Sequence, residues 1–207
     1  MSLTVACVKS KPAYDHHWVN RLYRAVKKHL SIPHRFVCFT DDSSGIACQT
    51  KPLPKGLRGW NAKMALHRPA ALSGKVLYLD LDTLVLGSLD FIAEYTGDFA
   101  ILRDFYREDG YGSGVMLWNR AQPQVWTRWL ELGMPEHPLG DQGWMEEFVP
   151  QADRLQDVFP GKFVSFKVHC ASGEVPQDAA VLSFHGAPKN NDFPREHWVT
   201  RMWEGAA

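Results

Sequence analysis

Two aspartates one residue apart interrupt the most apolar segment of the chain. Asp80 and Asp82 fall within residues 76–86 (VLYLDLDTLVL), a run typical of a strand buried on both faces of a parallel sheet. Because side chains alternate along a strand, we expect both carboxylates on one face. Two bare carboxylates there are unfavourable, so we expect the strand to end beneath a divalent cation, Mg²⁺ or Mn²⁺. The alternative is a pair of solvated acids at a strand end.

A second candidate group lies late in the chain, in residues 184–189 (FHGAPK). It follows a strand predicted over residues 181–184, and open α/β sheets bind ligands at the C-terminal tips of their strands. His185 can offer an imidazole nitrogen to the cation, Gly186 allows close approach of a phosphate, and Lys189 supplies a positive charge. Substrate phosphates usually complete such cation sites, so we expect a nucleotide diphosphate. The alternative is a surface turn with a solvated lysine.

Weaker candidates for contact with a sugar are spread between these two groups. Asp141 stands at the N-cap position of a short helix predicted over residues 142–148, where a carboxylate usually just caps the helix. With the neighbouring amide of Gln142 it can instead face a polarised sugar. Lys63 and Asp104 are charged residues that open or follow elements near the presumed site.

The elements that must position these residues follow an α/β pattern. Strands predicted over residues 3–8 and 34–40 flank a helix that Asp15 caps, and strand-helix-strand is the start of an α/β fold. A loop is predicted over residues 50–59, and Asn61 is expected to cap a short helix that ends at Pro69. Further strands are predicted over 99–102, 115–118 and 163–168, and further helical segments over 91–95, 123–132 and 195–203.

The amino-acid composition limits the classes of protein to which the chain can belong. The chain has 207 residues, enough for one domain, and its 23 Lys and Arg equal its 23 Asp and Glu. No net field therefore recruits nucleic acid. The four cysteines have no metal-ligand spacing and are expected to be reduced, and neither a signal peptide nor a membrane-spanning run is recognisable. We expect a cytoplasmic protein, with peripheral attachment to a membrane through the Trp-rich final helix left open.

Five short segments, in order, resemble motifs of one enzyme group. Residues 77–86 resemble the DxD motif of metal-dependent GT-A glycosyltransferases. GDQG (140–143) is similar to the DQ motif of their family 8 group, which includes glycogenin and bacterial galactosyltransferases. FHGAPK resembles that group's late HGxxKP motif. Residues 61–64 (NAKM) resemble its basic segment ahead of the metal motif, and residues 112–115 (GSGV) its (N)SGV segment.

The resemblance implies a fold, a reaction and a set of roles. It implies one GT-A domain over residues 1–207, with a Rossmann-like mixed sheet, a nucleotide and metal half over about 1–90 and a sugar and acceptor half over about 91–207. The reaction would move a hexose from a UDP-sugar with retention, to a glycan, lipid-linked or protein acceptor. The implied site residues are Asp80, Asp82 and His185 for Mn²⁺; Gly186 and Lys189 for the diphosphate; Lys63, Asp104, Asp141 and Gln142 for the sugar; and Ala6, Val8, Lys9 and Asp41 for the nucleoside.

The sequence departs from the group's motifs at two positions, and three other functions are weighed against the glycosyltransferase hypothesis. Gly112 stands where the group has Asn, and Asn190 where it has Pro. The missing amide keeps open a non-catalytic protein of the same fold that binds nucleotide sugars or carbohydrate. A phosphatase of the haloacid-dehalogenase type also has an apolar strand ending in DxDx(T/V), but here the fifth position is Leu84. A nucleotidyltransferase would need a glycine-rich loop after the first strand, and residues 9–12 (KSKP) lack glycine.

Overall fold

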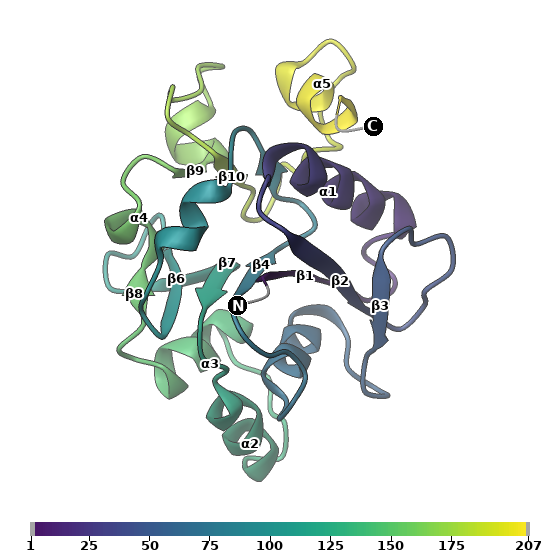
Figure 1. Ribbon diagram of the computed structural model, residues 1–207, viewed down its shortest axis with the longest axis vertical. Helices are drawn as coiled ribbons and strands as arrows, with labels where there is room; N and C mark the ends of the chain where they lie inside the picture. The colour runs from purple at the N-terminus through teal and green to yellow at the C-terminus, as the bar shows by residue number, and fades with distance from the viewer. Residues whose placement is uncertain (1–2, 206–207) are drawn as a thin grey trace.

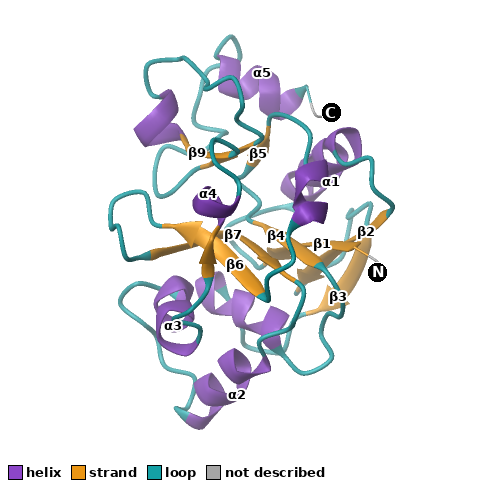
Figure 2. Cartoon of the chain, turned by 60° about the vertical axis from the view of Figure 1, so that its left-hand side comes forward, coloured by secondary structure: helices purple, strands orange, loops and turns teal. Residues whose placement is uncertain are grey.

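A computed structural model describes residues 3–205 of the chain. A seven-stranded sheet crosses the molecule, with helices on both faces (Figures 1 and 2). The strand order is β3-β2-β1-β4-β7-β6-β8, and β7 runs antiparallel to its neighbours β4 and β6, whereas the other pairs are parallel. The predicted mixed α/β fold is confirmed. The strands of this sheet are β1 (Leu3–Lys9), β2 (His34–Thr40), β3 (Gln49–Pro52), β4 (Val76–Leu79), β6 (Phe99–Arg103), β7 (Tyr111–Trp118) and β8 (Asp153–Arg154).

Each face of the sheet has its own apolar core. On β4, Leu77 and Leu79 enter one core, and Val76 and Tyr78 enter the other, as expected for a strand buried on both faces. The first core is covered by α1 (His16–His29), η2 (Asp90–Glu94) and α4 (Leu155–Val158). The second is covered by η1 (Gly59–His67), α2 (Pro123–Glu131) and α3 (Asp141–Phe148). The predicted cap of α1 is confirmed, because Asp15 accepts a hydrogen bond from the His17 backbone N–H at 2.9 Å.

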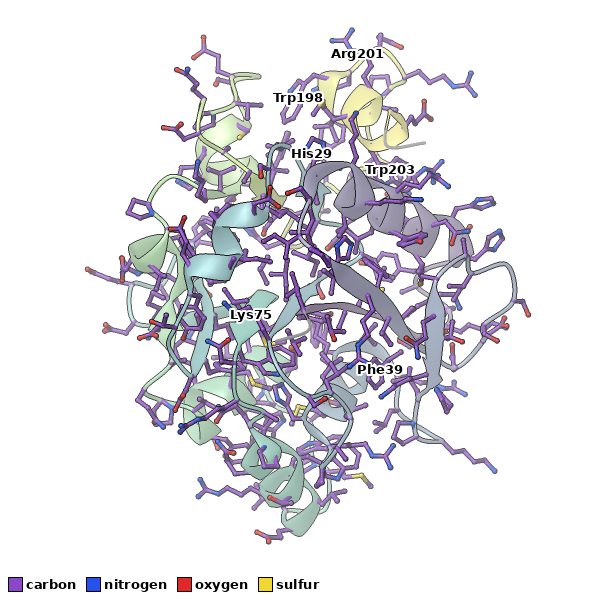
Figure 3. The ribbon with its side chains drawn as sticks, in the orientation of Figure 1. His29, Phe39, Lys75, Trp198, Arg201 and Trp203 are labelled. Atoms are coloured by element: carbon purple, nitrogen blue, oxygen red, sulfur yellow. The ribbon has the colours of Figure 1, made fainter. Side chains whose placement is uncertain are left out.

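A smaller sheet closes one end of the molecule. Its strands are β5 (Leu84–Val85), β10 (Val181–Ser183) and β9 (Phe163–Ser165), and they share a third core with η3 (Phe166–Cys170) and α5 (Trp198–Glu204). Trp203 of α5 lies beside α1 (Figure 3). Its ring packs against that of Trp18 in α1 with centroids 4.9 Å apart, and the guanidinium of Arg21 lies 4.1 Å from the Trp203 ring. The Trp-rich final helix therefore covers the core. Within residues 3–205, every helix is too short or too polar to cross a membrane.

The segment with the two aspartates is not one strand. β4 ends at Leu79, and residues 80–83 form a turn in which the Thr83 N–H donates to the Asp80 carbonyl at 3.1 Å. The chain then enters β5, which belongs to the other sheet. The strand ends directly before Asp80, as expected, but the alternation predicted along residues 76–86 is wrong beyond that point. The turn, rather than strand periodicity, sets the direction of Asp82.

Three other predictions of elements were wrong in detail. Residues 49–52, predicted in part as loop, form β3, an edge strand that tolerates Pro52 at its end. η1 is a 3₁₀-helix that begins at Gly59 instead of after Asn61, because the Gly59 N–H is held by the hydroxyl of Ser10 at 3.0 Å. The strand predicted over 163–168 ends at Ser165, whose hydroxyl accepts from the N–H of Val168 and starts the π-helical turn η3.

Candidate active site

A cavity of about 590 Å³ opens at the C-terminal ends of β1 and β4. The chain runs from β1 outward to β2 on one side and reaches β4 on the other, which is the switch point where open α/β sheets bind ligands. Segments far apart in sequence supply its walls. Among the predicted site residues, the lining contains Val8, Lys63, Asp80, Asp82, Asp104, Asp141, Gln142, His185, Gly186 and Lys189.

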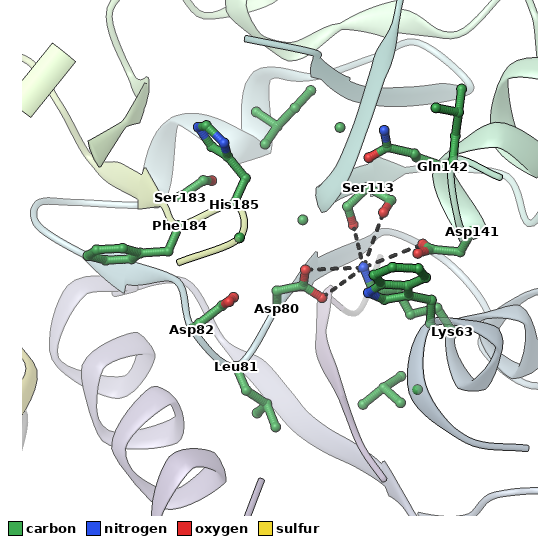
Figure 4. A pocket seen from close by; sticks show the side chains of 18 of the residues that line it. Lys63, Asp80, Leu81, Asp82, Ser113, Asp141, Gln142, Ser183, Phe184 and His185 are labelled. Carbon is green, nitrogen blue, oxygen red and sulfur yellow. Dashed lines mark hydrogen bonds and ion pairs between the residues drawn. The ribbon is translucent and has the colours of Figure 1, made fainter. Parts of the chain in front are cut away.

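The buried side chain of Lys63 contacts residues from three other segments of the chain at the centre of the cavity (Figure 4). The ammonium of Lys63, on η1, lies 3.0 Å from Asp80 Oδ1 and 3.4 Å from Asp141 Oδ2, and donates to the Ser113 hydroxyl at 3.1 Å. Burial by itself lowers the pKa of Lys63, but the charges of Asp141 and Asp80 raise it well above its ordinary value. Lys63 therefore carries its charge in the folded protein and holds both carboxylates in place.

Asp141 is not the N-cap of α3, so the capping position predicted for it is wrong. The N-cap of α3 is Gly140, whose φ of +66° suits glycine, and Asp141 is the first residue of the helix. Its side chain turns to Lys63 instead, and Asp141 is only 3% exposed. Burial raises the pKa of this carboxyl, and Lys63 partly offsets the effect. Asp141 Oδ2 is shielded from solvent: it forms the ion pair with Lys63 at 3.4 Å and accepts no hydrogen bond from residues 3–205.

Asp82 is paired with a different lysine. It is 3% exposed, forms an ion pair with Lys189, and accepts a hydrogen bond from the Tyr14 hydroxyl at 3.4 Å. Burial and the nearby charge of Asp80 raise the pKa of Asp82, and Lys189 opposes them. The two aspartates of the turn thus line one cavity but form ion pairs with different lysines, Asp80 with Lys63 and Asp82 with Lys189.

His185 lines the same cavity with its ring directed elsewhere. Its Nε2 lies 2.6 Å from the hydroxyl of Ser165, the ring stacks on Phe105 at 5.6 Å, and it points away from the two aspartates (Figure 4). Burial and the charge of Lys167 lower the pKa of His185, which favours the neutral, metal-binding form.

The three predicted metal ligands are near one another without forming a coordination site in this arrangement. Within the described part of the chain, no group of three or more His, Cys, Asp or Glu side chains is placed to hold an ion. The chemistry of the donors, two carboxylates and an imidazole, fits Mn²⁺ or Mg²⁺. Coordination by Asp80, Asp82 and His185 stays a prediction, and it requires Lys189 and Ser165 to release their partners.

Three residues predicted to contact the nucleoside lie outside the cavity lining. Ala6 is fully buried within β1. The ammonium of Lys9 donates to the Asp42 carbonyl at 3.0 Å, and Asp41 accepts from the Lys11 N–H at 3.0 Å. These contacts tie the ends of β1 and β2 together, so a nucleoside role for the three residues stays a prediction. Val8, the fourth, does line the cavity.

Sequence reasoning missed polar groups that complete the site. The Tyr78 hydroxyl donates to Asp80 Oδ1 at 2.6 Å, and a signal for this existed, because residues two apart on a strand share a face. Ser113 lies inside the GSGV segment, yet nothing in its type indicated a contact with Lys63. Tyr14 comes from the loop after β1, and no local pattern predicts its contact with Asp82.

Comparison with known proteins identifies the fold. No protein-family model and no curated protein sequence matches the chain. Among solved structures, the glycosyltransferase GlyE of Streptococcus pneumoniae TIGR4 is similar with a TM-score of 0.73 and 17% identity, covering 99% of this chain and 60% of GlyE. The bifunctional glycosyltransferase WbbM is similar with a TM-score of 0.74 and 10% identity, covering 100% of this chain and 50% of WbbM.

A third similar structure matches this chain in length. The galactosyltransferase LgtC, in complex with donor and acceptor sugar analogs, has a TM-score of 0.65 and 15% identity, with 98% of this chain and 95% of LgtC covered. The chain therefore has the GT-A fold of these glycosyltransferases, although it spans only 60% of GlyE and half of WbbM.

Proposed function

We propose that this chain is a metal-dependent, retaining glycosyltransferase of the family 8 type that moves a hexose from a UDP-sugar to an acceptor. One observation carries the proposal. Lys63, Asp80 and Asp141 bring their charges together, largely shielded from water, at the ligand-binding edge of a sheet whose fold is shared with glycosyltransferases. Buried charge clusters contribute little net stability, so their presence in a cavity indicates a functional site.

The chain's own residues divide between the two halves of the donor. Lys189 and Gly186 bind the diphosphate, and the nucleoside lies toward Val8, with Ala6, Lys9 and Asp41 around it. Mn²⁺ or Mg²⁺, when bound by Asp80, Asp82 and His185, neutralises the leaving diphosphate. Asp141, Gln142 and Asp104 face the sugar, with Lys63 fixing the carboxylate of Asp141. Preorganised oxygens there favour a transition state with oxocarbenium character.

Both halves of the chain contribute to this one site, which supports a single domain. The lining comes from residues 8–82 and from residues 102–189. The acceptor belongs to the second half under this proposal.

A panel of nucleotide sugars, incubated with Mn²⁺ and scored for released nucleotide, tests the proposal without knowledge of the acceptor. We expect release of UDP from at least one UDP-hexose. Stabilisation by UDP without release from any donor would favour the non-catalytic binding protein instead. Gln142→Ala should slow release while UDP binding is retained, and the exposed Gln177→Ala serves as its matched control. Loss of UDP binding in Gln142→Ala would show that the sugar role is misassigned.

A further inference from the structure

Two aromatic side chains of the cavity remain largely open to solvent. Trp60 and Tyr106 are each 68% exposed, and both line the cavity described above. Every other tryptophan of the chain is buried or half-buried. An exposed indole leaves a large apolar surface in water, and burial of that surface is the main stabilising use of the residue. Neither ring belongs to an apolar core of residues 3–205.

The ring of Trp60 is in contact with the protein on one side. It packs directly on the backbone of Gly140, since a Cβ at that position would lie 2.9 Å from Trp60 Cε3 and 3.1 Å from Cδ2. The positive φ of Gly140 excludes most other residues there. At the other end, the hydrogen bond from Gly59 to Ser10 anchors the backbone beside Trp60. One side of the indole therefore rests on the Gly140 backbone, and most of the ring remains open to a ligand.

The same geometry places Trp60 next to the charged cluster. A 3₁₀-helix has three residues per turn, so Trp60 and Lys63 lie on one face of η1. Gly140, under the indole, directly precedes Asp141, which pairs with Lys63 at 3.4 Å. The open ring therefore borders the residues to which the donor sugar is assigned.

Tyr106 enters the cavity from the loop between β6 and β7. Its backbone N–H donates to Asp104 Oδ1 at 2.8 Å, which fixes the turn. Its ring stands nearly perpendicular to that of His185, with centroids 5.2 Å apart and an interplanar angle of 83°. The cavity thus has aromatic rings from η1 and from this loop, with the polar side chains of Asp104 and Gln142 in the same lining.

We propose that Trp60 and Tyr106 form the acceptor subsite, and that the acceptor is a glycan whose terminal pyranose ring stacks on Trp60. This rests on the proposed function. A pyranose has an apolar C–H face and a rim of hydroxyls, which matches open aromatic rings beside carboxylate and amide oxygens. An acyl chain would cover the Gln142 amide without offering it a hydrogen-bond partner.

The test is binding of an array of free oligosaccharides with pyranose termini, measured without donor. Wild type should retain at least one glycan, and Trp60→Ala should weaken that binding by roughly ten-fold, as for an aromatic anchor. Tyr106→Ala should weaken it by a smaller factor, and Trp60→Phe should keep most of the affinity. Leu132→Ala, which truncates a side chain 57% exposed and outside the cavity lining, should match wild type.

Two results would overturn the inference. One is the absence of any retained glycan, or equal retention by wild type and Trp60→Ala with unchanged melting temperatures. The other is a loss of UDP affinity in Trp60→Ala as large as its loss of glycan affinity, which would place the indole against the nucleoside. Donor turnover is measured separately. Glycan binding through Trp60 without release of nucleotide would contradict the proposed transfer reaction but support the proposed glycan site.

Discussion

The ammonium of Lys189 forms an ion pair with the carboxylate of Asp82, a contact between residues 107 positions apart in the chain. Asp82 is almost completely buried, and a buried carboxylate needs a cationic or hydrogen-bonding partner. In this arrangement Lys189 is paired with a carboxylate that the proposed function assigns to the metal ion. Binding of the metal with a diphosphate would move Lys189 from Asp82 to the phosphate, where the proposal needs it.

Mn²⁺ together with UDP is therefore expected to raise the melting temperature of wild type, and Asp82→Ala should abolish the gain. The reason is that Asp82 contributes to the metal site through which the diphosphate is held. Differential scanning fluorimetry with and without both ligands measures the effect, and the exposed Asp178→Ala should behave as wild type. A gain of equal size in Asp82→Ala would remove Asp82 from the metal site.

Lys63→Met should reduce both stability and turnover. The substitution leaves Asp80 and Asp141 close together without their shared cation, and breaking a buried ion pair in this way costs about 3–5 kcal/mol. Urea unfolding measures the loss, and the exposed Lys27→Met should change stability by under about 0.5 kcal/mol.

The double variant Lys63→Met with Asp141→Asn separates the two effects. Removing the second charge should recover part of the lost stability, because no unpaired carboxylate remains at residue 141. Turnover should stay low, since the sugar-facing carboxylate is gone. Recovery of turnover along with stability would show that the pair has a structural role alone.

His67 should make the protein less stable in mild acid. Burial lowers the pKa of this imidazole to about 4, and its Nε2 has no hydrogen-bond partner among residues 3–205. Below the unfolded pKa of about 6.5, the unfolded chain gains a proton that the folded protein does not, so stability falls until about pH 4. Between about pH 7 and pH 4.5 this contributes a loss of about 2 kcal/mol.

Substitution of His67 isolates that contribution from the titration of the carboxylates. The free energy of unfolding of His67→Phe should fall by about 2 kcal/mol less than that of wild type over the same range of pH. The exposed His17→Phe is the matched control and should follow wild type. Identical pH profiles for His67→Phe and wild type would mean that His67 becomes protonated within the folded protein.

Asn190→Leu should stabilise the protein. Asn190 is 0% exposed, and neither its amide nitrogen nor its oxygen has a hydrogen-bond partner in the described residues. Leucine has a similar shape and no polar atoms, so the free energy of unfolding should rise by about 1–3 kcal/mol. The exposed Asn191→Leu tests for a general effect of added apolar surface. Destabilisation by Asn190→Leu would indicate that an ordered water satisfies the amide.

The order of the main elements and the location of the cavity were predictable from sequence. Alternating and continuous apolar runs predicted β1, α1, β2 and β4, because each element buries one or both faces in a core. Asp80 and His185 come directly after or close to strand ends, and strand ends converge at one edge of the sheet. Local pattern was therefore enough to bring the candidate residues to one cavity.

The partners of each charge could not be predicted, because they depend on contacts between distant segments. Lys63 and Lys189 both line the cavity, yet only the tertiary structure assigns one to Asp80 and the other to Asp82. Asp141 looked like a helix cap until the backbone of Gly140 took that position. Gly140 also supports the ring of Trp60, a contact across 80 positions that no local pattern reveals. The short edge strands β3 and β8 were missed because they have little burial to mark them.

The most direct test of the central claim is the release of UDP from a UDP-hexose in the presence of Mn²⁺, measured for wild type and Asp82→Ala in one assay. If the cavity around Asp80, Asp82 and Lys63 is a donor site, wild type should release UDP and Asp82→Ala should release little or none. Equal release by both proteins, or none by wild type from any UDP-sugar, would contradict the account.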